Sequence, residues 1–462
     1  MKINEITLTN VKEPMIFPEV GPVFLTDKTI NERKIKLLNR MKEEGFDSLI
    51  IYADKEHGSN FEYLTGFFPR FEEALLILKS SGKCHVILGN ENLKMASYSR
   101  TDVELIHSPL FSLPNQPMDN EICLESIFKK LNLNKKEKIG IIGWKMFTTR
   151  LSNPNKIFDI PYFIMQELIK VIDEDKIYNA TYLMIGDRGV RTTNNSNEIA
   201  HYEYGANLAS NAILNAMNII DVDKKESELG NILSIDGQYH SVVTIAATGQ
   251  RFENANFYPS HKKIKLGDPL SMTVAYKGGL SSRTGFVIET ENQLPQKQKN
   301  YLDRIAKPYF NAVVNWLKEL KIGMTGNDLY QIIEKVFPKE NYGWHLNPGH
   351  LVADEEWMSS PIYKDSKEKL KSGMIFQIDI IPSINGYTGV SAEECVAIAD
   401  KDLQLSIQNK YPELWNRISI RKKYLKEELN ISLSDDILPL SNTVAYLRPF
   451  YLDKKSALKV KE

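Results

Sequence analysis

Two acidic residues stand inside apolar sequence in the stretch 372-SGMIFQIDIIPSINGYTGVSAEECVAIAD-400. The first, Asp379, interrupts the run MIFQIDII, and the second, Glu393, comes at the head of a further apolar run. Burial of a carboxylate costs free energy unless the charge is paired, hydrogen-bonded or bound to a ligand. The two acids are therefore candidates for a functional site.

The apolar runs around these acids predict two strands. Side chains alternate between the faces of a strand, so Gln377 and Asp379 share one face of the first strand, whereas its other face is wholly apolar. In the second strand, Glu393 shares a face with Ser391 and Cys395. We therefore expect both acids to face a polar pocket inside their domain.

Length and composition limit the class of protein. A chain of 462 residues predicts two or three domains, and 42% hydrophobic with 25% charged residues is typical of a packed globular protein. The 58 basic and 59 acidic residues give a net charge of −1, so we expect neither nucleic acid nor a membrane surface as a partner. We find no apolar run of bilayer length and no signal peptide, and the three cysteines lack metal-type spacing, so we expect a cytoplasmic protein with reduced thiols.

Helical and strand patterns alternate over the first third of the chain, which predicts an α/β domain. We expect helices at 31–46 and 162–172, and strands at 47–54, 72–79, 84–90 and 137–144. The sequence turns polar between 181 and 198, and this change places the end of the first domain at residue 190.

The second domain, 191–400, has an α+β pattern. A long helix begins near Asn195, strands are expected at 241–248, 269–276, 282–290, 374–381 and 389–399, and further helices at 301–323, with a kink at Pro308, and at 325–337. Residues 277–281 contain two glycines and predict a hairpin connection. We expect residues 401–462 to form a C-terminal extension that packs on this domain.

The order of a long helix, a hairpin, the segment 347-NPGHL-351 and two acid-bearing strands resembles the pita-bread metallopeptidase family that includes aminopeptidase P, prolidase and creatinase. The segments 60-NFEYLTGF-67 and 191-RTTNNSNEIAHYEYGANLA-209 resemble that family as well. The resemblance covers roughly residues 30 to 400. It implies a creatinase-type α/β N-terminal domain, a pita-bread C-terminal domain and a homodimer.

The resemblance also implies a site, in which two metal ions are held by two aspartates, one histidine and two glutamates. The histidine corresponds to His350, and the glutamates to Asp379 and Glu393. The first aspartate position is occupied by Thr273, and the second by Ser282 or Thr284. Neutral hydroxyls are poor ligands for two mutually repelling divalent ions, so we do not expect a dinuclear centre.

Three further positions follow from the resemblance as substrate-binding residues. Two pocket histidines of the family correspond here to Phe257 and Trp357, neither of which can carry a proton. Arg70, in the first domain of a neighbouring subunit, is placed to hold a substrate carboxylate.

Three functions are open on these residues. The first is a pocket that binds a peptide or small amide-type ligand without dinuclear catalysis. The second is a hydrolase of a C–N bond that uses His350, Asp379 and Glu393 as catalytic groups, either around one Mn²⁺ or Zn²⁺ ion or without metal. The third is a working dinuclear peptidase, whose missing ligands would have to come from Glu253, His261 or Asp354. A purely structural alternative for Asp379 is a hydrogen-bonded cluster with the neighbouring hydroxyls.

Overall fold

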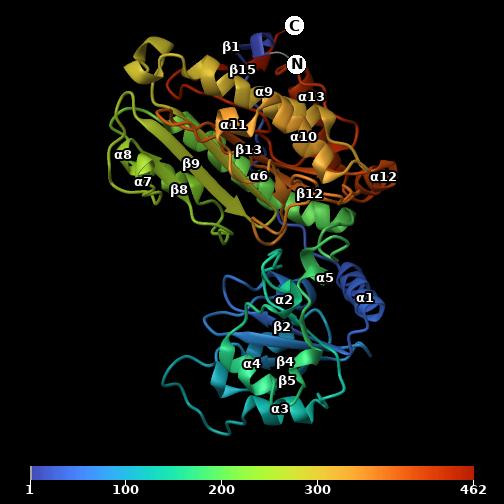
Figure 1. Ribbon diagram of the computed structural model, residues 1–462. Helices are drawn as coiled ribbons and strands as arrows, with labels where there is room; N and C mark the ends of the chain where they lie inside the picture. Colours follow the sequence, from blue (N-terminus) through green and yellow to red (C-terminus); the bar gives the residue numbers. More distant parts are fainter. Residues whose placement is uncertain (1–2, 462) are drawn as a thin grey trace. The chain divides into compact units, whose positions relative to one another are not determined.

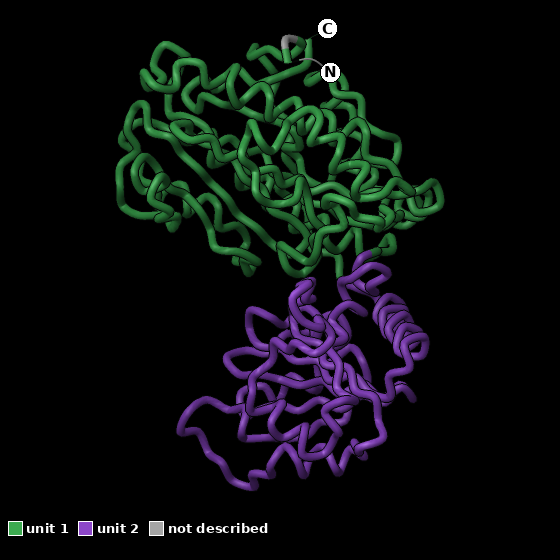
Figure 2. The backbone as a smooth tube through the Cα atoms, viewed as in Figure 1, with its two compact units in different colours: residues 1–24, 193–462 green, residues 25–192 purple. Residues whose placement is uncertain are grey.

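The computed structural model describes residues 3–461 (Figure 1). The chain divides into two compact units, unit 1 with residues 1–24 and 193–462, and unit 2 with residues 25–192 (Figure 2). Residues near the start of the chain thus belong to the unit that contains its end. The cause is a two-stranded antiparallel sheet, in which β1 (Ile6–Asn10) pairs with β15 (Ser456–Val460). Hydrophobic periodicity along the sequence carries no information about such a distant pairing.

Unit 2 contains a six-stranded mixed sheet in the order β5-β4-β3-β2-β6-β7. Its strands are β2 (Ser48–Ala53), β3 (Ala74–Lys79), β4 (Cys84–Leu88), β5 (Glu104–His107), β6 (Ile139–Ile142) and β7 (Ile177–Asn179). Its helices are α1 (Asp27–Glu44), α2 (Ser59–Thr65), α3 (Leu124–Lys130), α4 (Tyr162–Leu168) and α5 (Tyr182–Ile185). The α/β class expected for this part of the chain is confirmed.

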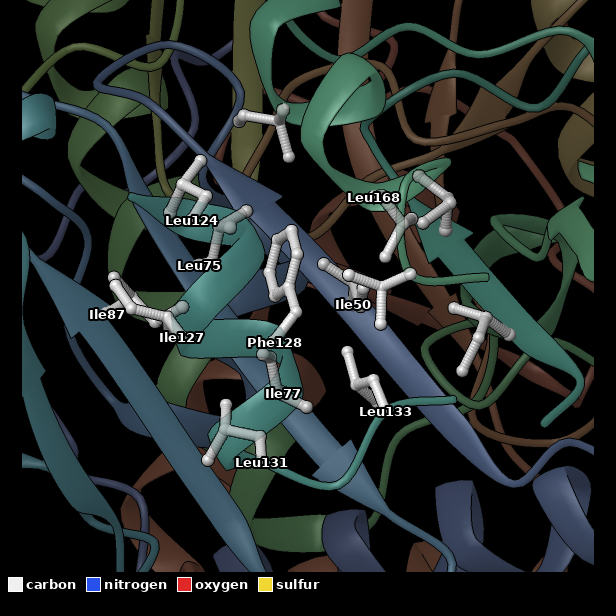
Figure 3. Packing of buried hydrophobic residues seen from close by; sticks show 14 of the residues in the cluster. Ile50, Leu75, Ile77, Ile87, Leu124, Ile127, Phe128, Leu131, Leu133 and Leu168 are labelled. Carbon is white, nitrogen blue, oxygen red and sulfur yellow. The ribbon is translucent and has the colours of Figure 1, made fainter. Parts of the chain in front are cut away.

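A hydrophobic core forms where helices cover this sheet (Figure 3). Ile50 of β2 and Ile77 of β3 meet Phe128 of α3 and Leu168 of α4, and all four side chains are inaccessible to solvent. Burial of such side chains is the main favourable contribution to folding. The apolar runs of the sequence are therefore the central strands of this sheet.

Unit 1 contains a seven-stranded antiparallel sheet, with six strands in the order β11-β12-β13-β10-β9-β8 and with β14 paired to β13. Its strands are β8 (Ile245–Thr248), β9 (Pro269–Tyr276), β10 (Gly279–Phe286), β11 (His350–Leu351), β12 (Ile375–Ile378), β13 (Ser391–Ile398) and β14 (Ile437–Pro439). Its helices are α6 (Ser196–Ile219), α7 (Glu226–Leu233), α8 (Gln250–Glu253), α9 (Lys307–Glu319), α10 (Gly326–Val336), α11 (Lys339–Tyr342), α12 (Lys401–Lys410) and α13 (Pro412–Glu427). Within the described residues, no helix is long and apolar enough to cross a membrane.

The expected strand boundaries differ from the structure at two places that matter for the site. The predicted connection 277–281 is in fact a two-residue turn at Lys277 and Gly278, so β10 begins at Gly279 and Ser282 lies inside the strand. Gly278 permits this turn because its φ is 101°, in the region that favours glycine. The strand expected at 374–381 ends at Ile378, one residue before Asp379.

The helix expected at 301–323 begins as a π turn, Leu302–Ala306, and continues as α9. Pro308 stands in the first turn of α9, where the missing N–H of proline is tolerated. The predicted irregularity is therefore present, and it lies on the N-terminal side of the proline.

Helix α6 packs directly on the hairpin of β9 and β10 (Figure 1). A Cβ atom added at Gly205 of α6 would lie 1.8 Å from the Lys277 carbonyl oxygen, and one added at Gly278 would lie 2.1 Å from the Tyr202 carbonyl oxygen. Only glycine allows this approach, because backbone atoms on both sides cannot give way. The contact fixes the hairpin against the long helix.

We predict that Gly205→Ala lowers the free energy of unfolding by about 1 to 3 kcal/mol or more, because overpacking against backbone is costly. In an ordinary helix interior, the same change raises stability by roughly 0.5 to 1 kcal/mol. Urea unfolding measures the difference. Gly21→Ala is the matched control, since no atom lies within 4 Å of its added Cβ. A stability gain at Gly205 would contradict the close packing.

Candidate functional site

Strand register places four side chains in one row across the sheet. Thr273 of β9 pairs with Ser282 of β10, and Ser282 pairs with Glu393 of β13. Ile378 of β12 pairs with Glu394, so continuation of this antiparallel register by one residue sets Asp379 opposite Glu393. Because side chains of paired residues lie on the same face, the four groups meet on one surface of the sheet.

The hydroxyls of this surface are hydrogen-bonded to one another. The Thr273 Oγ1 donates to Ser282 Oγ at 2.9 Å, and the Ser282 and Ser391 hydroxyl oxygens are 2.8 Å apart. Two residues further along each strand, and therefore on the same face, the Thr284 Oγ1 donates to Ser271 Oγ at 2.9 Å. The polar groups of β9 and β10 are thus satisfied within the sheet.

His350 of β11 pairs with Gln377 of β12 and is fully buried. Its Nε2 is 3.1 Å from Glu356 Oε1 and 3.7 Å from Asp379 Oδ2, and its ring stacks on Trp357 with centroids 4.0 Å apart. Burial disfavours the charged imidazolium, but Glu356 and Asp379 outweigh that cost and raise the pKa of His350 above its ordinary value. The His350 ring thus lies between two acidic side chains, Glu356 and Asp379.

Burial dominates the titration of the two acids. It raises the pKa of Asp379 to about 6, although the nearby His350 opposes the shift. Burial also raises the pKa of Glu393 well above its ordinary range, and repulsion from Asp379 and Glu356 adds to the effect. Glu394 points elsewhere, since its fully buried carboxylate pairs with Arg283 at 2.6 Å and accepts a hydrogen bond from Ser281 at 2.8 Å.

A pocket of about 870 Å³ opens over this surface. Asp379 and Glu393 both line it, together with the hydroxyl residues and residues 381–390 of the loop between β12 and β13. Phe257 and Trp357 also line the pocket. Four acidic residues line the pocket: Glu253, Glu356, Asp379 and Glu393. No lysine or arginine is found among its described lining residues.

Most of the remaining candidate residues do not line the pocket. His350 is covered by Trp357 and does not line the pocket itself. Arg70 is an exposed residue of unit 2, with its guanidinium carbon 5.5 Å from the centroid of the Phe71 ring. Asp354 accepts a hydrogen bond from the Tyr202 hydroxyl at 3.1 Å, and His261 is exposed and also outside the lining. Of the replacement ligands considered, Glu253 alone lines the pocket.

Glu356 is the residue that sequence reasoning missed. It lies in an irregular segment between β11 and β12, where no periodicity indicates which way a side chain points. The signal in the sequence was its position beside Trp357, in 354-DEEWMSSP-361, but nothing there predicts a contact with His350. The contact depends on how the segment folds back over β11.

The residues present do not fit a dinuclear metal centre. Two positions on β9 and β10 carry neutral hydroxyls, and these hydroxyls already bond to each other or to Ser391. Within residues 3–461, no group of three or more His, Cys, Asp or Glu side chains is arranged to hold a metal ion. We therefore derive no reaction step through a pair of metals.

Comparison with known proteins gives a consistent assignment. Residues 200–400 match the model of metallopeptidase family M24. Similar solved structures include a prolidase from Thermococcus sibiricus, with 22% identity, a TM-score of 0.62 and coverage of 80% of this chain and 95% of that chain. An Xaa-Pro dipeptidase from Bacillus anthracis has 17% identity, a TM-score of 0.60 and coverage of 81% of this chain and 96% of that chain. A prolidase from Pyrococcus furiosus is similar as well, with 20% identity, a TM-score of 0.58 and coverage of 79% of this chain and 96% of that chain. No curated protein matches the chain in sequence.

We predict that the stability difference between Asp379→Asn and wild type grows with pH. The folded pKa of about 6 lies above the unfolded value of about 4, so the folded state keeps a proton that the unfolded state releases. The free energy of unfolding of wild type therefore falls as the pH rises from about 4 to 6. The free energy of unfolding of the variant does not fall in this way. It should therefore rise relative to that of wild type by on the order of 2 to 3 kcal/mol over the same pH range.

Urea unfolding at pH 4, 5, 6 and 7, with EDTA throughout, tests this prediction. Tryptophan fluorescence is a suitable signal, because four of the five tryptophans lie in unit 1. The substitution also removes the repulsion that Asp379 exerts on Glu393 and its attraction for His350, so the difference reports the coupled group of side chains rather than Asp379 alone. A difference that does not change with pH would contradict the raised pKa.

Proposed function

We propose that the pocket of unit 1 binds a peptide or small amide-type ligand without dinuclear metal catalysis. The match of residues 200–400 to the model of metallopeptidase family M24 supports this proposal. The observation that carries this proposal is the pair of hydroxyls, Thr273 and Ser282, at the two positions where the family has aspartates. Prolidases and an Xaa-Pro dipeptidase are among the similar solved structures, which is the reason to expect a peptide-like ligand.

The charge of the ligand set supports the proposal. Two divalent ions held close together need several anionic ligands to offset their repulsion, and hydroxyls offer no charge. A metal-bound water is a strong nucleophile because coordination lowers its pKa from 15.7 to roughly 7. Without the ligands for both ions, that source of nucleophile is lost while the pocket and its walls remain.

The alternative function is a hydrolase of a C–N bond that works with one Mn²⁺ or Zn²⁺ ion or without metal. The observation that favours it is that Asp379 and Glu393 both line the pocket, where the register of β12 and β13, continued by one residue, brings them side by side. Two carboxyl groups so placed suit a general acid and a general base. His350 would then act as a positioning residue beside Asp379, since it does not line the pocket.

We predict that alanyl-proline binds the intact protein and is not cleaved, with Mn²⁺ or with EDTA. Glu393→Gln should weaken binding about ten-fold, because one carboxyl oxygen that can accept a hydrogen bond from the ligand becomes an NH₂ group that cannot. Calorimetry measures binding, and chromatography of the mixture measures release of proline.

Glu340→Gln is the matched control, because Glu340 of α11 is exposed and lies outside the pocket lining. Turnover that disappears in Glu393→Gln and persists in Glu340→Gln would support the hydrolase instead. A dipeptide that is neither bound nor cleaved would overturn both functions for this class of ligand.

A further inference from the structure

Unit 1 contains a second pocket, which is built by segments from both ends of the chain. Its volume is about 620 Å³, within the range of about 300 to 1,000 Å³ that is usual for ligand pockets. Its lining comes from residues 16–23, from residues 410–417 at the junction of α12 and α13, and from Ala200 of α6. It shares no lining residue with the pocket over the sheet, and both segments lie outside the part of the chain that matches the family model.

Side chains of α6 hold the N-terminal segment of this pocket in place. The Nδ2 groups of Asn207 and Asn211 donate to the Phe17 carbonyl oxygen at 2.9 and 3.0 Å, and the Phe17 N–H donates to Asn211 Oδ1 at 3.3 Å. Further along the segment, His201 Nδ1 lies 2.6 Å from the Val23 carbonyl oxygen. Because the helix binds the backbone of the segment at both places, this wall of the pocket is a fixed part of the fold.

Two arginines of α13 share one buried carboxylate next to the other wall. Glu203 of α6 accepts hydrogen bonds from Arg417 Nε at 2.9 Å and Nη2 at 2.7 Å, and from Arg421 Nη2 at 2.7 Å. The side chains of Glu203, Arg421 and Arg417 are only 1%, 2% and 12% exposed. No further carboxylate of the described residues pairs with either guanidinium, so the three side chains together carry one positive charge in excess.

This excess charge has a cost that a bound anion would offset. Burial lowers the pKa of Arg421, and repulsion from Arg417 adds to the shift although Glu203 opposes it. A buried charge without a partner of opposite sign destabilises the folded protein. An anion beside the cluster would pair each guanidinium with one negative charge.

Arg417 has donors left for such an anion. A guanidinium carries five N–H donors in a planar fork. Glu203 occupies the edge formed by Nε and Nη2, whereas Arg417 Nη1 bonds to no described residue. Arg417 lines the pocket, and the other charged lining residues are exposed and screened by water: Glu19, Lys410 and Glu413. The least hydrated charge in the described lining is therefore a cation with a free edge.

Most of the remaining lining is apolar: Ile16, Phe17, Val20, Val23, Ala200 and Leu414. An apolar group of a ligand gains roughly 25 cal/mol for each Å² that it buries against such a wall. The pocket thus combines one cationic group with a surface that favours hydrocarbon.

We propose that this second pocket binds a carboxylate that carries an apolar group, with the carboxylate on the edge of Arg417 formed by Nη1 and Nη2. Two parallel N–H donors match the two oxygens of a carboxylate. The site is independent of the function proposed for the pocket over the sheet. A free aliphatic acid and the C-terminal residue of a peptide both supply this chemistry.

Two pairs of probes test the inference and distinguish these sources. Hexanoate and hexanamide differ in charge at nearly constant shape, and so do N-acetylleucine and N-acetylleucine amide. Affinities are measured by calorimetry on the full chain at pH 7.5, with EDTA and at low ionic strength because salt screens the charge.

The carboxylate of at least one pair should bind about ten-fold more tightly than its amide, in line with a charge-assisted bidentate contact. The pair with the tighter carboxylate identifies the source as aliphatic acid or peptide end. Arg417→Gln should remove most of the preference. Lys423→Gln is the matched control, because it removes an exposed cation of the same helix that lies outside the pocket lining, and it should leave the preference unchanged.

Folding of the variants is checked by thermal unfolding. Arg417→Gln leaves Glu203 paired one to one with Arg421, so we expect a folded protein. Arg417→Lys is the second variant if it does not fold. It keeps the charge but loses the planar pair of donors, and it should still reduce the preference.

Three results would overturn the inference. The first is equal affinity of carboxylate and amide in both pairs, and the second is the absence of binding by every probe. The third is a preference that survives in the Arg417 variants or that Glu393→Gln removes instead, which would place the carboxylate elsewhere. None of these results bears on the function proposed for the pocket over the sheet, which is tested with its own dipeptide.

Discussion

The register of four neighbouring strands is the constraint on which the site depends. Backbone pairing of β9, β10, β13 and β12 sets Thr273, Ser282, Glu393 and Asp379 side by side, although Thr273 and Glu393 are 120 residues apart in the chain. A slip of one residue in any pair would turn a whole row of side chains to the other face. The chemistry of the pocket is therefore a property of the sheet rather than of any single motif.

Close packing behind the hairpin holds this register in place. Gly205 on α6 and Gly278 in the turn allow helix and hairpin to approach to backbone contact, so the turn of β9 and β10 is fixed at two residues. On the neighbouring strand, the buried pair of Arg283 and Glu394 crosses from β10 to β13. Breaking a buried pair leaves an uncompensated charge, which gives this pairing a strong penalty against misregister.

Sequence reasoning reached the row of candidate residues because strand alternation is a local property. The alternation around Asp379 and Glu393 was enough to place both acids toward a pocket, and the family resemblance supplied Thr273 and Ser282 as their neighbours. The reasoning failed where structure depends on distant contacts. The pairing of β1 with β15, the burial of His350 beneath Trp357 and the approach of Glu356 all require the fold, since no local periodicity encodes them.

The central claim is that hydroxyls replace the ligands of a dinuclear centre. Elemental analysis of protein purified with Mn²⁺ or Zn²⁺ and then gel-filtered tests it most directly, with the double variant Thr273→Asp and Ser282→Asp beside wild type. The account predicts at most one ion per wild-type chain and a gain of bound metal in the double variant, because two carboxylates are added where the hydroxyls now bond to each other. Two ions per wild-type chain would contradict it.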